Sequence, residues 1–175
     1  MTIITISGTP GSGKSTIGNL LKNKLNMRYV YSGMIFRDTA KKYDMTLEEF
    51  GNFCENNEKI DKELDEKQLN ILKNGDVILE GRLAGWIAYK NNIEAFKIML
   101  IANLETRIKR IIEREEGAYN KRLEENLKRE KSEQKRYKKY YNIDIKDTSI
   151  YDLIIDTSNK TPDEIIDIII NKIQN

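Results

Sequence analysis

The chain has 175 residues, the size of one compact domain, and 39% of them are hydrophobic and 33% charged. This charge and the lack of a long apolar run exclude a membrane-spanning protein, and the N-terminus lacks a secretory pattern, so we expect a cytoplasmic protein. With no His and one Cys, zinc sites, disulfides and His-dependent triads are excluded. Any chemistry must use carboxylates, Lys, Arg, hydroxyls, backbone amides and a bound metal ion.

The net charge of +2 gives no sign of nucleic-acid binding, but the charge is unevenly distributed. Residues 105–146 carry 14 basic and 9 acidic side chains, so we expect this segment to meet anions. A solvated helical face accounts equally well for many of its lysines. Clustered aromatic residues that could stack on bases occur only near its end, at Tyr137, Tyr140 and Tyr141. We therefore expect no stable nucleic-acid partner.

The first half of the chain alternates apolar runs with helical periodicity. Residues 2–7 are rich in β-branched side chains and precede Gly8, as in a strand buried on both faces of a parallel sheet. Further along we expect a helix at 14–25, a strand at 27–31, a helix from Ser32 to 42, and two helices within 45–73, where Thr46 and Glu49 have capping-box spacing.

The second half continues the alternation. We expect strands at 76–80, 96–101 and 151–156, a basic helix at 104–114 that ends before Gly117, a charged helix at 122–141, and a last helix with Thr161 as N-cap and Pro162 at its first position. Strands that alternate with helices favour an α/β fold with a parallel sheet covered by helices on both faces.

The most specific motif is a complete G-x-x-x-x-G-K-[ST] sequence between the first strand and the first helix. Glycines let the backbone curl so that successive N–H groups point inward, and the helix N-terminus adds partial positive charge. Lys14 would reach the β- and γ-phosphates of a nucleotide, and the Ser15 hydroxyl would ligate Mg²⁺. The motif consists of Gly8, Thr9, Pro10, Gly11, Ser12, Gly13, Lys14 and Ser15, and Thr16 follows it.

This loop alone leaves switch GTPases, motor ATPases and small-molecule kinases open. A guanine-specific Asn-Lys-x-Asp element is not formed at Asn159, because Pro162 occupies its fourth place. The third strand runs into Glu80-Gly81-Arg82 and not into an Asp-x-x-Gly switch. These features favour a kinase.

Two further turns are candidates for binding an acceptor. Ser32 and Gly33 follow the second strand with Arg37 one helical turn later, which predicts an anion site. After the third strand, Arg82 can grip a phosphate in bidentate fashion, and Glu80 can hold a metal through water. Parallel strands bring both turns to the same sheet edge.

Arginines recur at helical spacing on two consecutive helices. Two such stripes would repel each other unless an anion lies between them, and we expect that anion to be a transferred phosphoryl group. Ion pairing with nearby glutamates is the alternative. The residues are Arg107, Arg110 and Arg114 on the first helix and Arg129, Glu133 and Arg136 on the second.

Five segments in this order resemble the short, archaeal type of cytidylate kinase, a family of nucleoside-monophosphate kinases, over nearly the whole length. They are GTPGSGKST, SGMIFR, LEGRLAGW, REKSEQKRY and SIYDLIIDTS. The resemblance implies a P-loop nucleoside-triphosphate-binding fold with a five-stranded parallel sheet. It also implies a core (1–32, 76–109 and 129–175), a small monophosphate-binding lobe at 33–75, and a lid near 110–128.

The implied reaction transfers a phosphoryl group from ATP to CMP or dCMP with Mg²⁺, in a monomer without membrane association. The resemblance places ATP on the loop residues Gly8 to Thr16 together with Arg107 and Arg110. It places CMP on Ser32, Gly33, Arg37, Arg82, Arg129, Glu133 and Arg136. Catalysis would involve Lys14, Arg110, Arg129 and Arg136, and Mg²⁺ would be held by Ser15 and, through water, Glu80.

Two alternatives stay open at this point. The first is a related kinase that acts on UMP, AMP or another small metabolite. The second is a nucleotide-dependent switch or RNA-binding protein that uses the basic segment at residues 105–146. Release of ADP that depends on a nucleoside monophosphate would separate a kinase from the second alternative.

Overall fold

The computed structural model describes residues 2–174, without the side chains of residues 47 and 48. Five strands form one parallel sheet in the order β2-β3-β1-β4-β5, which confirms the predicted fold class. The strands are β1 (Ile3–Gly8), β2 (Arg28–Tyr31), β3 (Val77–Glu80), β4 (Phe96–Ile101) and β5 (Leu153–Asp156).

The central strand explains why the sheet needs helices on both faces. Every residue of β1 is buried, and its backbone pairs with β3 on one side and β4 on the other, with Ile4 opposite Ile78 and Phe96. Side chains alternate between the faces, so Ile3 and Ile4 belong to different apolar clusters. A run of apolar, β-branched residues is suited to this doubly buried position.

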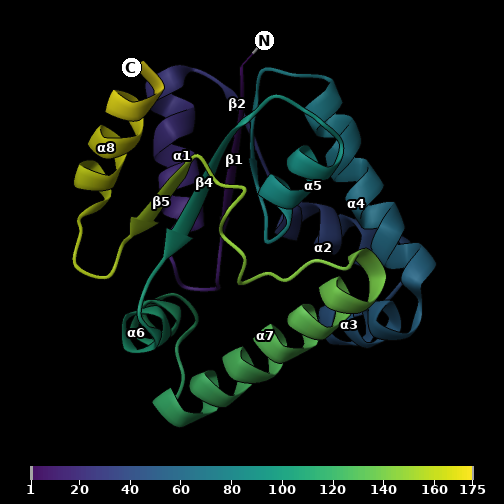
Figure 1. Ribbon diagram of the computed structural model, residues 1–175. Coiled ribbons are helices and arrows are strands. Elements are labelled where there is room, and N and C mark those ends of the chain that lie inside the picture. The colour runs from purple at the N-terminus through teal and green to yellow at the C-terminus, as the bar shows by residue number, and fades with distance from the viewer. Residues whose placement is uncertain (1, 175) are drawn as a thin grey trace.

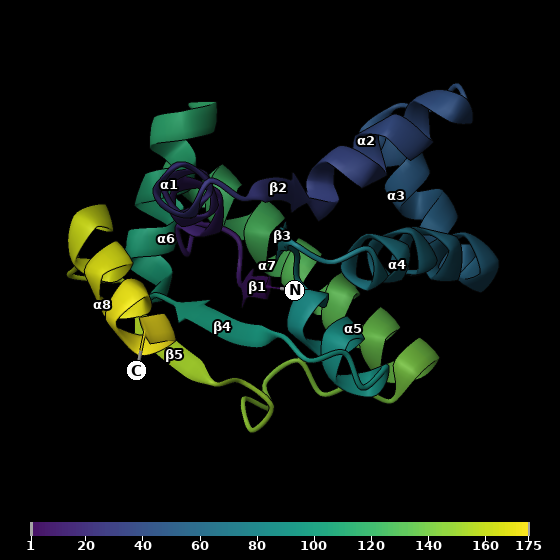
Figure 2. The same ribbon diagram turned by 90° about the horizontal axis from the view of Figure 1, so that it is seen from above.

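Helices cover the sheet on both faces and form a separate group beyond its edge (Figures 1 and 2). Helices α1 and α8 pack on one face with Ile4, and α4 and α5 pack on the other with Ile3. The helices are α1 (Lys14–Leu25), α2 (Ser32–Lys42), α3 (Leu47–Asn56), α4 (Glu58–Lys73), α5 (Ala84–Lys90), α6 (Leu104–Glu115), α7 (Tyr119–Tyr141) and α8 (Pro162–Gln174).

The lower part of Figure 1 contains the elements that matter most for function. Helices α6 and α7 lie beyond the ends towards which the β4 and β5 arrows point, and α7 runs across to α3. Helices α2, α3 and α4 share an apolar cluster of their own around Phe50, Cys54 and Leu64. The carboxyl ends of the strands therefore face α6 and α7, with this helical group beside them (Figure 1).

Several local predictions are confirmed. Thr46 and Glu49 form the capping box of α3, and Thr161 and Glu164 make the same reciprocal contacts before α8. Helix α6 ends at Glu115 and α7 begins at Tyr119. Gly117, which lies between them, has a φ of 110°.

Three local predictions were wrong or incomplete. Helix α5 was missed because its residues 84–88 are all buried, so the polar face that marks a surface helix is absent. Helix α7 begins at Tyr119 and not at residue 122. Strand β5 begins at Leu153 and not at residue 151. Among residues 2–174, no helix is both long and apolar enough to span a membrane.

Candidate functional site

The glycine loop leaves β1 and enters α1, as its sequence predicts. Gly11 has a φ of 80°, and a Cβ atom there would lie 2.5 Å from the Arg107 carbonyl oxygen. Gly8 has a φ of 155°, and a Cβ atom there would collide with the backbone of Leu100. Only glycine combines these backbone angles with such close packing, so the loop is held tightly between β4 and α6.

Lys14 lies inside the curve of this loop, where its Nζ donates a hydrogen bond to the Thr9 carbonyl oxygen at 3.0 Å. Loss of hydration lowers the pKa of Lys14 to about 8, and nearby Glu80 opposes this shift. A poorly hydrated cation whose hydrogen bond goes to a neutral carbonyl is ready to accept an anionic partner.

Beside Lys14, the first turn of α1 and the end of β3 bring a hydroxyl and a carboxylate together. Ser15 Oγ donates to Glu80 Oε1 at 3.2 Å, and the Tyr29 hydroxyl donates to the other oxygen of Glu80. Hydroxyl and carboxylate oxygens are ligands that Mg²⁺ accepts, and a magnesium site in a kinase needs only one or two of them beside substrate phosphates. Among residues 2–174, no three His, Cys, Asp or Glu side chains form a metal-binding group, so an all-protein metal cage is absent there.

Arg107 and Arg110 of α6 lie on the outer side of the loop. Arg107 is buried, contacts the Pro10 carbonyl oxygen at 3.3 Å and forms an ion pair with Glu130 of α7. Arg107 thus joins α6 to the glycine loop and to α7.

Arg110 contacts the loop and the end of β5 together. Its Nη2 donates to the Thr157 carbonyl oxygen at 2.7 Å, and its Nη1 donates to the Thr157 hydroxyl at 2.9 Å. That hydroxyl in turn donates to the Ser12 carbonyl oxygen at 3.0 Å. Thr157 therefore anchors the loop, and no pattern in the sequence indicates this role.

A buried ion-pair network lies next to the loop. Arg82 donates from Nη1 to the Gly8 carbonyl oxygen at 3.0 Å and from Nε to Glu133 at 2.5 Å. Arg129 donates to the other oxygen of Glu133 at 3.0 Å. Burial opposes ionisation of Glu133, but these arginines overcome it and hold the pKa of its carboxyl below the usual range. The network brings a carboxylate and two cations from β3 and α7 to the loop.

The network continues away from the loop to Arg136 and Asp61. Arg136 Nη1 lies 3.2 Å from Asp61 Oδ1, which joins α7 to α4. The second oxygen of Asp61 and the Nε of Arg136 are buried without a hydrogen-bond partner. Asp61 was not among the sequence candidates, because a carboxylate on a charged helix has no distinguishing signal.

The other expected acceptor residues lie at the start of α2. Arg37 is exposed, stacks on the Tyr31 ring and donates to its hydroxyl at 3.1 Å. A Cβ atom at Gly33 would lie 3.8 Å from Arg37. Ser32 faces Gly81, where a Cβ atom would lie 2.8 Å from its hydroxyl oxygen. The ends of β2 and β3 are thus close together, and Arg37 is exposed beside Tyr31.

The structure corrects the electrostatic argument about the arginine stripes. The protein's own carboxylates pair with most of these arginines: Glu130 pairs with Arg107, Glu133 with Arg129, and Asp61 with Arg136. Arg114 points elsewhere and pairs with its neighbour Glu115. Repulsion between the stripes therefore does not by itself require a bound anion.

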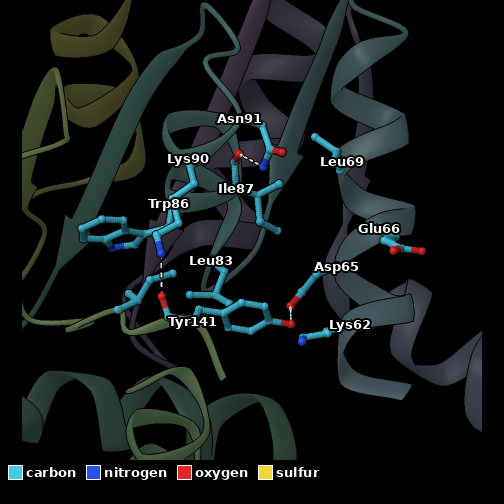
Figure 3. A pocket seen from close by; sticks show the side chains of 11 residues that line it. Lys62, Asp65, Glu66, Leu69, Leu83, Trp86, Ile87, Lys90, Asn91 and Tyr141 are labelled. Atoms are coloured by element: carbon cyan, nitrogen blue, oxygen red, sulfur yellow. Dashed lines mark hydrogen bonds between the residues drawn. The ribbon is translucent and has the colours of Figure 1, made fainter. Parts of the chain in front are cut away.

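A pocket of about 180 Å³ lies apart from these residues, between α4, α5 and the end of α7 (Figure 3). Its wall is mainly apolar, with Leu83, Trp86 and Ile87, and the Tyr141 hydroxyl donates to Asp65 across it. None of the residues expected to bind nucleotides lines it.

The sheet order and the glycine loop define the class of the protein as a P-loop kinase fold. Shikimate kinase from Aquifex aeolicus superposes with a TM-score of 0.64 over 99% of this chain and 96% of its own, at 18% identity, and this likeness concerns the fold alone.

Sequence relatives define the family. The Cytidylate kinase-like family matches residues 3–159, and the chain belongs to this family. A protein named cytidylate kinase from Methanococcus vannielii is 51% identical over 157 residues, 89% of this chain and 90% of that protein. Another of that name from Methanocaldococcus jannaschii is 45% identical over 99% of this chain and 98% of its own length.

Proposed function

We propose that the protein is a cytidylate kinase that transfers the γ-phosphoryl group of ATP to CMP or dCMP and forms ADP with CDP or dCDP. The observation that carries this proposal is near-full-length similarity to proteins named cytidylate kinase. The glycine loop and the Arg82 network support it, because they bring phosphate-binding groups to one sheet edge.

The ATP phosphates would lie in the loop from Gly8 to Thr16. Backbone N–H groups and the N-terminus of α1 would bind them, and Lys14 would move from the Thr9 carbonyl to the β- and γ-phosphates. Arg110 lies near enough to the loop to contribute, with Nη1 3.4 Å from the Gly11 carbonyl oxygen. The contacts of Arg107 with Glu130 and Pro10 support a role in shaping the ATP site.

Mg²⁺ would be held by Ser15, by the ATP phosphates and, through water, by Glu80. The hydroxyl and carboxylate already lie in contact, which fits a hard cation that takes few protein ligands. When bound, the ion would offset negative charge on the phosphates during transfer. The contact of Tyr29 with Glu80 would orient the carboxylate.

CMP would enter between α2, α4 and α7, with its phosphate towards Arg82 and the loop. The Arg82 side chain is 10% exposed and fixed by Glu133, whereas Arg129 is 64% exposed and free to turn towards a phosphate. Arg37, Ser32 and Gly33 would complete the acceptor site.

The attacking group needs no general base, because a phosphate oxygen of CMP is already anionic. Catalysis would then consist of alignment, charge neutralisation and exclusion of water, which Lys14, Arg110, Arg129 and Arg136 would supply. We also propose that residues 33–75 form a monophosphate-binding lobe and residues 110–128 a lid. Their closure would prevent ATP hydrolysis.

A coupled assay of ADP release with CMP, dCMP, UMP and AMP as acceptors tests the proposal. We expect the highest kcat/KM with CMP or dCMP and almost no ADP release without an acceptor. A clear preference for AMP, or ADP release that no monophosphate stimulates, would overturn it.

A further inference from the structure

Glu130 of α7 is a carboxylate near the glycine loop that the proposed mechanism does not use. It forms an ion pair with Arg107, whose side chain is 8% exposed. Arg107 Nη1 also lies 3.3 Å from the Pro10 carbonyl oxygen and 3.4 Å from Asn126 Oδ1. Asn126 and Glu130 are one helical turn apart, so α7 and the glycine loop meet on a single guanidinium nitrogen.

The backbone of Arg107 is packed against the same loop. A Cβ atom at Gly11 would lie 2.5 Å from the Arg107 carbonyl oxygen and 2.9 Å from the Arg107 Cα atom. The loop and the first turn of α6 thus touch without space between them. Because contacts packed in this way transmit a displacement, movement of Arg107 is passed to the loop that would hold the ATP phosphates.

The ion pair also joins the two ends of the proposed lid. Residues 110–128 begin just after Arg107 and end just before Glu130. Inside this segment, Arg122 donates from Nε to the Glu116 carbonyl oxygen at 2.7 Å, which ties the start of α7 to the end of α6. Movement of the lid therefore acts on the ion pair at its base.

The neighbours of Glu130 on α7 belong to the acceptor side. Arg129 precedes it, and Glu133, one turn later, pairs with both Arg129 and Arg82. A CMP phosphate that attracts the exposed Arg129 would release one oxygen of Glu133 and change the charges along the helix. Because a helix moves as one rigid element, such a change displaces Glu130 as well.

Arg107 keeps hydrogen-bonding capacity for a second arrangement. Its Nε is buried and has no hydrogen-bond partner among residues 2–174. A buried donor without an acceptor costs free energy, so a shifted guanidinium that satisfies this donor can compete with the present one. The pair of Arg107 and Glu130 is therefore suited to a change of position that α7 controls.

We propose that Glu130 is a positioning residue that couples the two substrate sites. It passes the rearrangement of α7 on CMP binding through Arg107 to the glycine loop, so that each nucleotide raises the affinity for the other. This inference rests on the proposed function and adds the route by which the acceptor prepares the ATP site. The coupling is reciprocal, and it favours tight ATP binding when an acceptor is present.

A purely structural ion pair makes a different prediction. Loss of a brace between α6 and α7 would weaken ATP binding by the same factor with and without CMP. Loss of a coupling residue removes the gain that CMP adds, whatever the affinity for ATP alone. The ratio of the two ATP affinities therefore separates the two roles.

The first experiment measures by calorimetry the Kd of the non-hydrolysable ATP analogue AMP-PNP with Mg²⁺, without CMP and with saturating CMP. In the wild type, we expect CMP to lower this Kd about 5-fold or more, and in Glu130→Gln we expect almost no change. Glu124→Gln is the matched control, because Glu124 forms an exposed ion pair with Lys128 on the same helix, and it should keep the wild-type ratio. A ratio in Glu130→Gln within about 2-fold of the wild-type ratio overturns the inference.

A second variant removes both charges and serves if Glu130→Gln fails to fold, as judged by thermal unfolding. Arg107→Met combined with Glu130→Leu leaves no unpaired charge at this position, and apolar replacement of a whole buried pair is often tolerated. A direct contact of Arg107 with ATP cancels in the ratio. We expect the ratio to be near 1, and a wild-type ratio in this double variant overturns the inference.

These outcomes separate the inference from the proposed function. If the wild type phosphorylates neither CMP nor dCMP, the proposed function fails. If the wild type is a cytidylate kinase in which CMP leaves the Kd of AMP-PNP unchanged, or in which the ratio does not respond to Glu130, only the inference fails.

Discussion

The two halves of the candidate site are built in different ways. The glycine loop is one continuous segment whose shape follows from its own residues, chiefly glycines at positive φ such as Gly11. The acceptor side is assembled from β3, α4 and α7, and its arginines are balanced by carboxylates distant in the sequence, such as Glu133 opposite Arg82. A continuous motif can therefore be recognised from the chain, whereas the ion-pair network depends on the fold. Substitutions in the two halves should differ in the same way.

The largest expected effect is the loss of transfer in Lys14→Met. Removal of the cation that would bind the β- and γ-phosphates should lower kcat by about 10³-fold or more. Steady-state turnover at saturating ATP and CMP measures it. Turnover near the wild-type rate would remove Lys14 from the mechanism.

The same substitution should not weaken the fold. The pKa of Lys14 is lowered from its ordinary 10.5 to about 8 in the folded chain. The unfolded chain therefore binds this proton more tightly, and the charge of Lys14 lowers the stability of the fold below pH 8. Without nucleotide, Lys14→Met should unfold at a higher temperature than the wild type at pH 7. The difference should disappear as pH rises from 8 to 10.5. A lower unfolding temperature at pH 7 would show that Lys14 stabilises the empty loop.

Arg82→Ala should affect both activity and stability, unlike Lys14→Met. Glu133 would stay buried with the exposed Arg129 as its remaining close partner. The loss of Arg82 should therefore lower the unfolding free energy by about 3–5 kcal/mol. Activity should fall about 10²-fold. Urea unfolding and turnover measure the two effects. Arg129→Ala is the control, with a stability loss of about 1 kcal/mol or less because its side chain is exposed.

The stability loss in Arg82→Ala should depend on pH. The folded-state pKa of Glu133 is lowered, so its stabilising contribution is present above its ordinary value of 4.5 and is lost as pH falls through the folded value. The difference between wild type and Arg82→Ala should therefore shrink in acid. A constant difference would indicate that Arg82 stabilises the fold by contacts other than Glu133.

Glu80→Gln should have a smaller effect, confined to the metal. Loss of the carboxylate beside Ser15 should weaken the apparent Mg²⁺ affinity about 10-fold at saturating nucleotide, because a carboxylate that holds a metal through water acts mainly by its charge. A magnesium titration of turnover measures it. Tyr29→Phe, which keeps the Glu80 carboxylate, should change this affinity much less; equal changes would assign Glu80 a structural role.

The smallest effect is expected outside the site, in Asp65→Asn. Burial raises the pKa of Asp65 to about 7 from its ordinary 3.8. The folded chain therefore holds this proton more tightly, so stability falls as pH rises from 3.8 to 7, and the cost is absent below 3.8. The variant should unfold about 2–4 °C higher than the wild type at pH 8 and equally at pH 3.5. Thermal unfolding at the two pH values measures this, and a variant that is less stable at pH 8 would contradict it.

The strands and the loop could be predicted from the sequence because both rest on local patterns. The apolar run of β1, the capping boxes and the Gly117 break are local signals, and the structure has all of them. Helix α5 was not predicted, because residues 84–88 are all buried and the sequence therefore shows no helical alternation of apolar and polar residues.

The side chains that complete the site could not be found in the same way. Asp61, Tyr29 and Thr157 gain their roles only from partners 51 to 145 residues away, namely Arg136, Glu80 and Ser12. One sequence contains no record of which distant residues meet. The Arg82–Glu133 pair illustrates the intermediate case, in which both residues were named but their contact was not.

The hydrogen bond from the Thr157 hydroxyl to the glycine loop has a consequence for synthesis of the protein. The loop is complete in sequence once residue 15 has been made, but one of its supports is the hydroxyl of Thr157, which lies 145 residues after Ser12. A nascent chain that ends before β5 therefore contains the glycine loop without the hydrogen bond from Thr157. The contact between Thr157 and Ser12 can form only after the chain has been synthesised beyond β5.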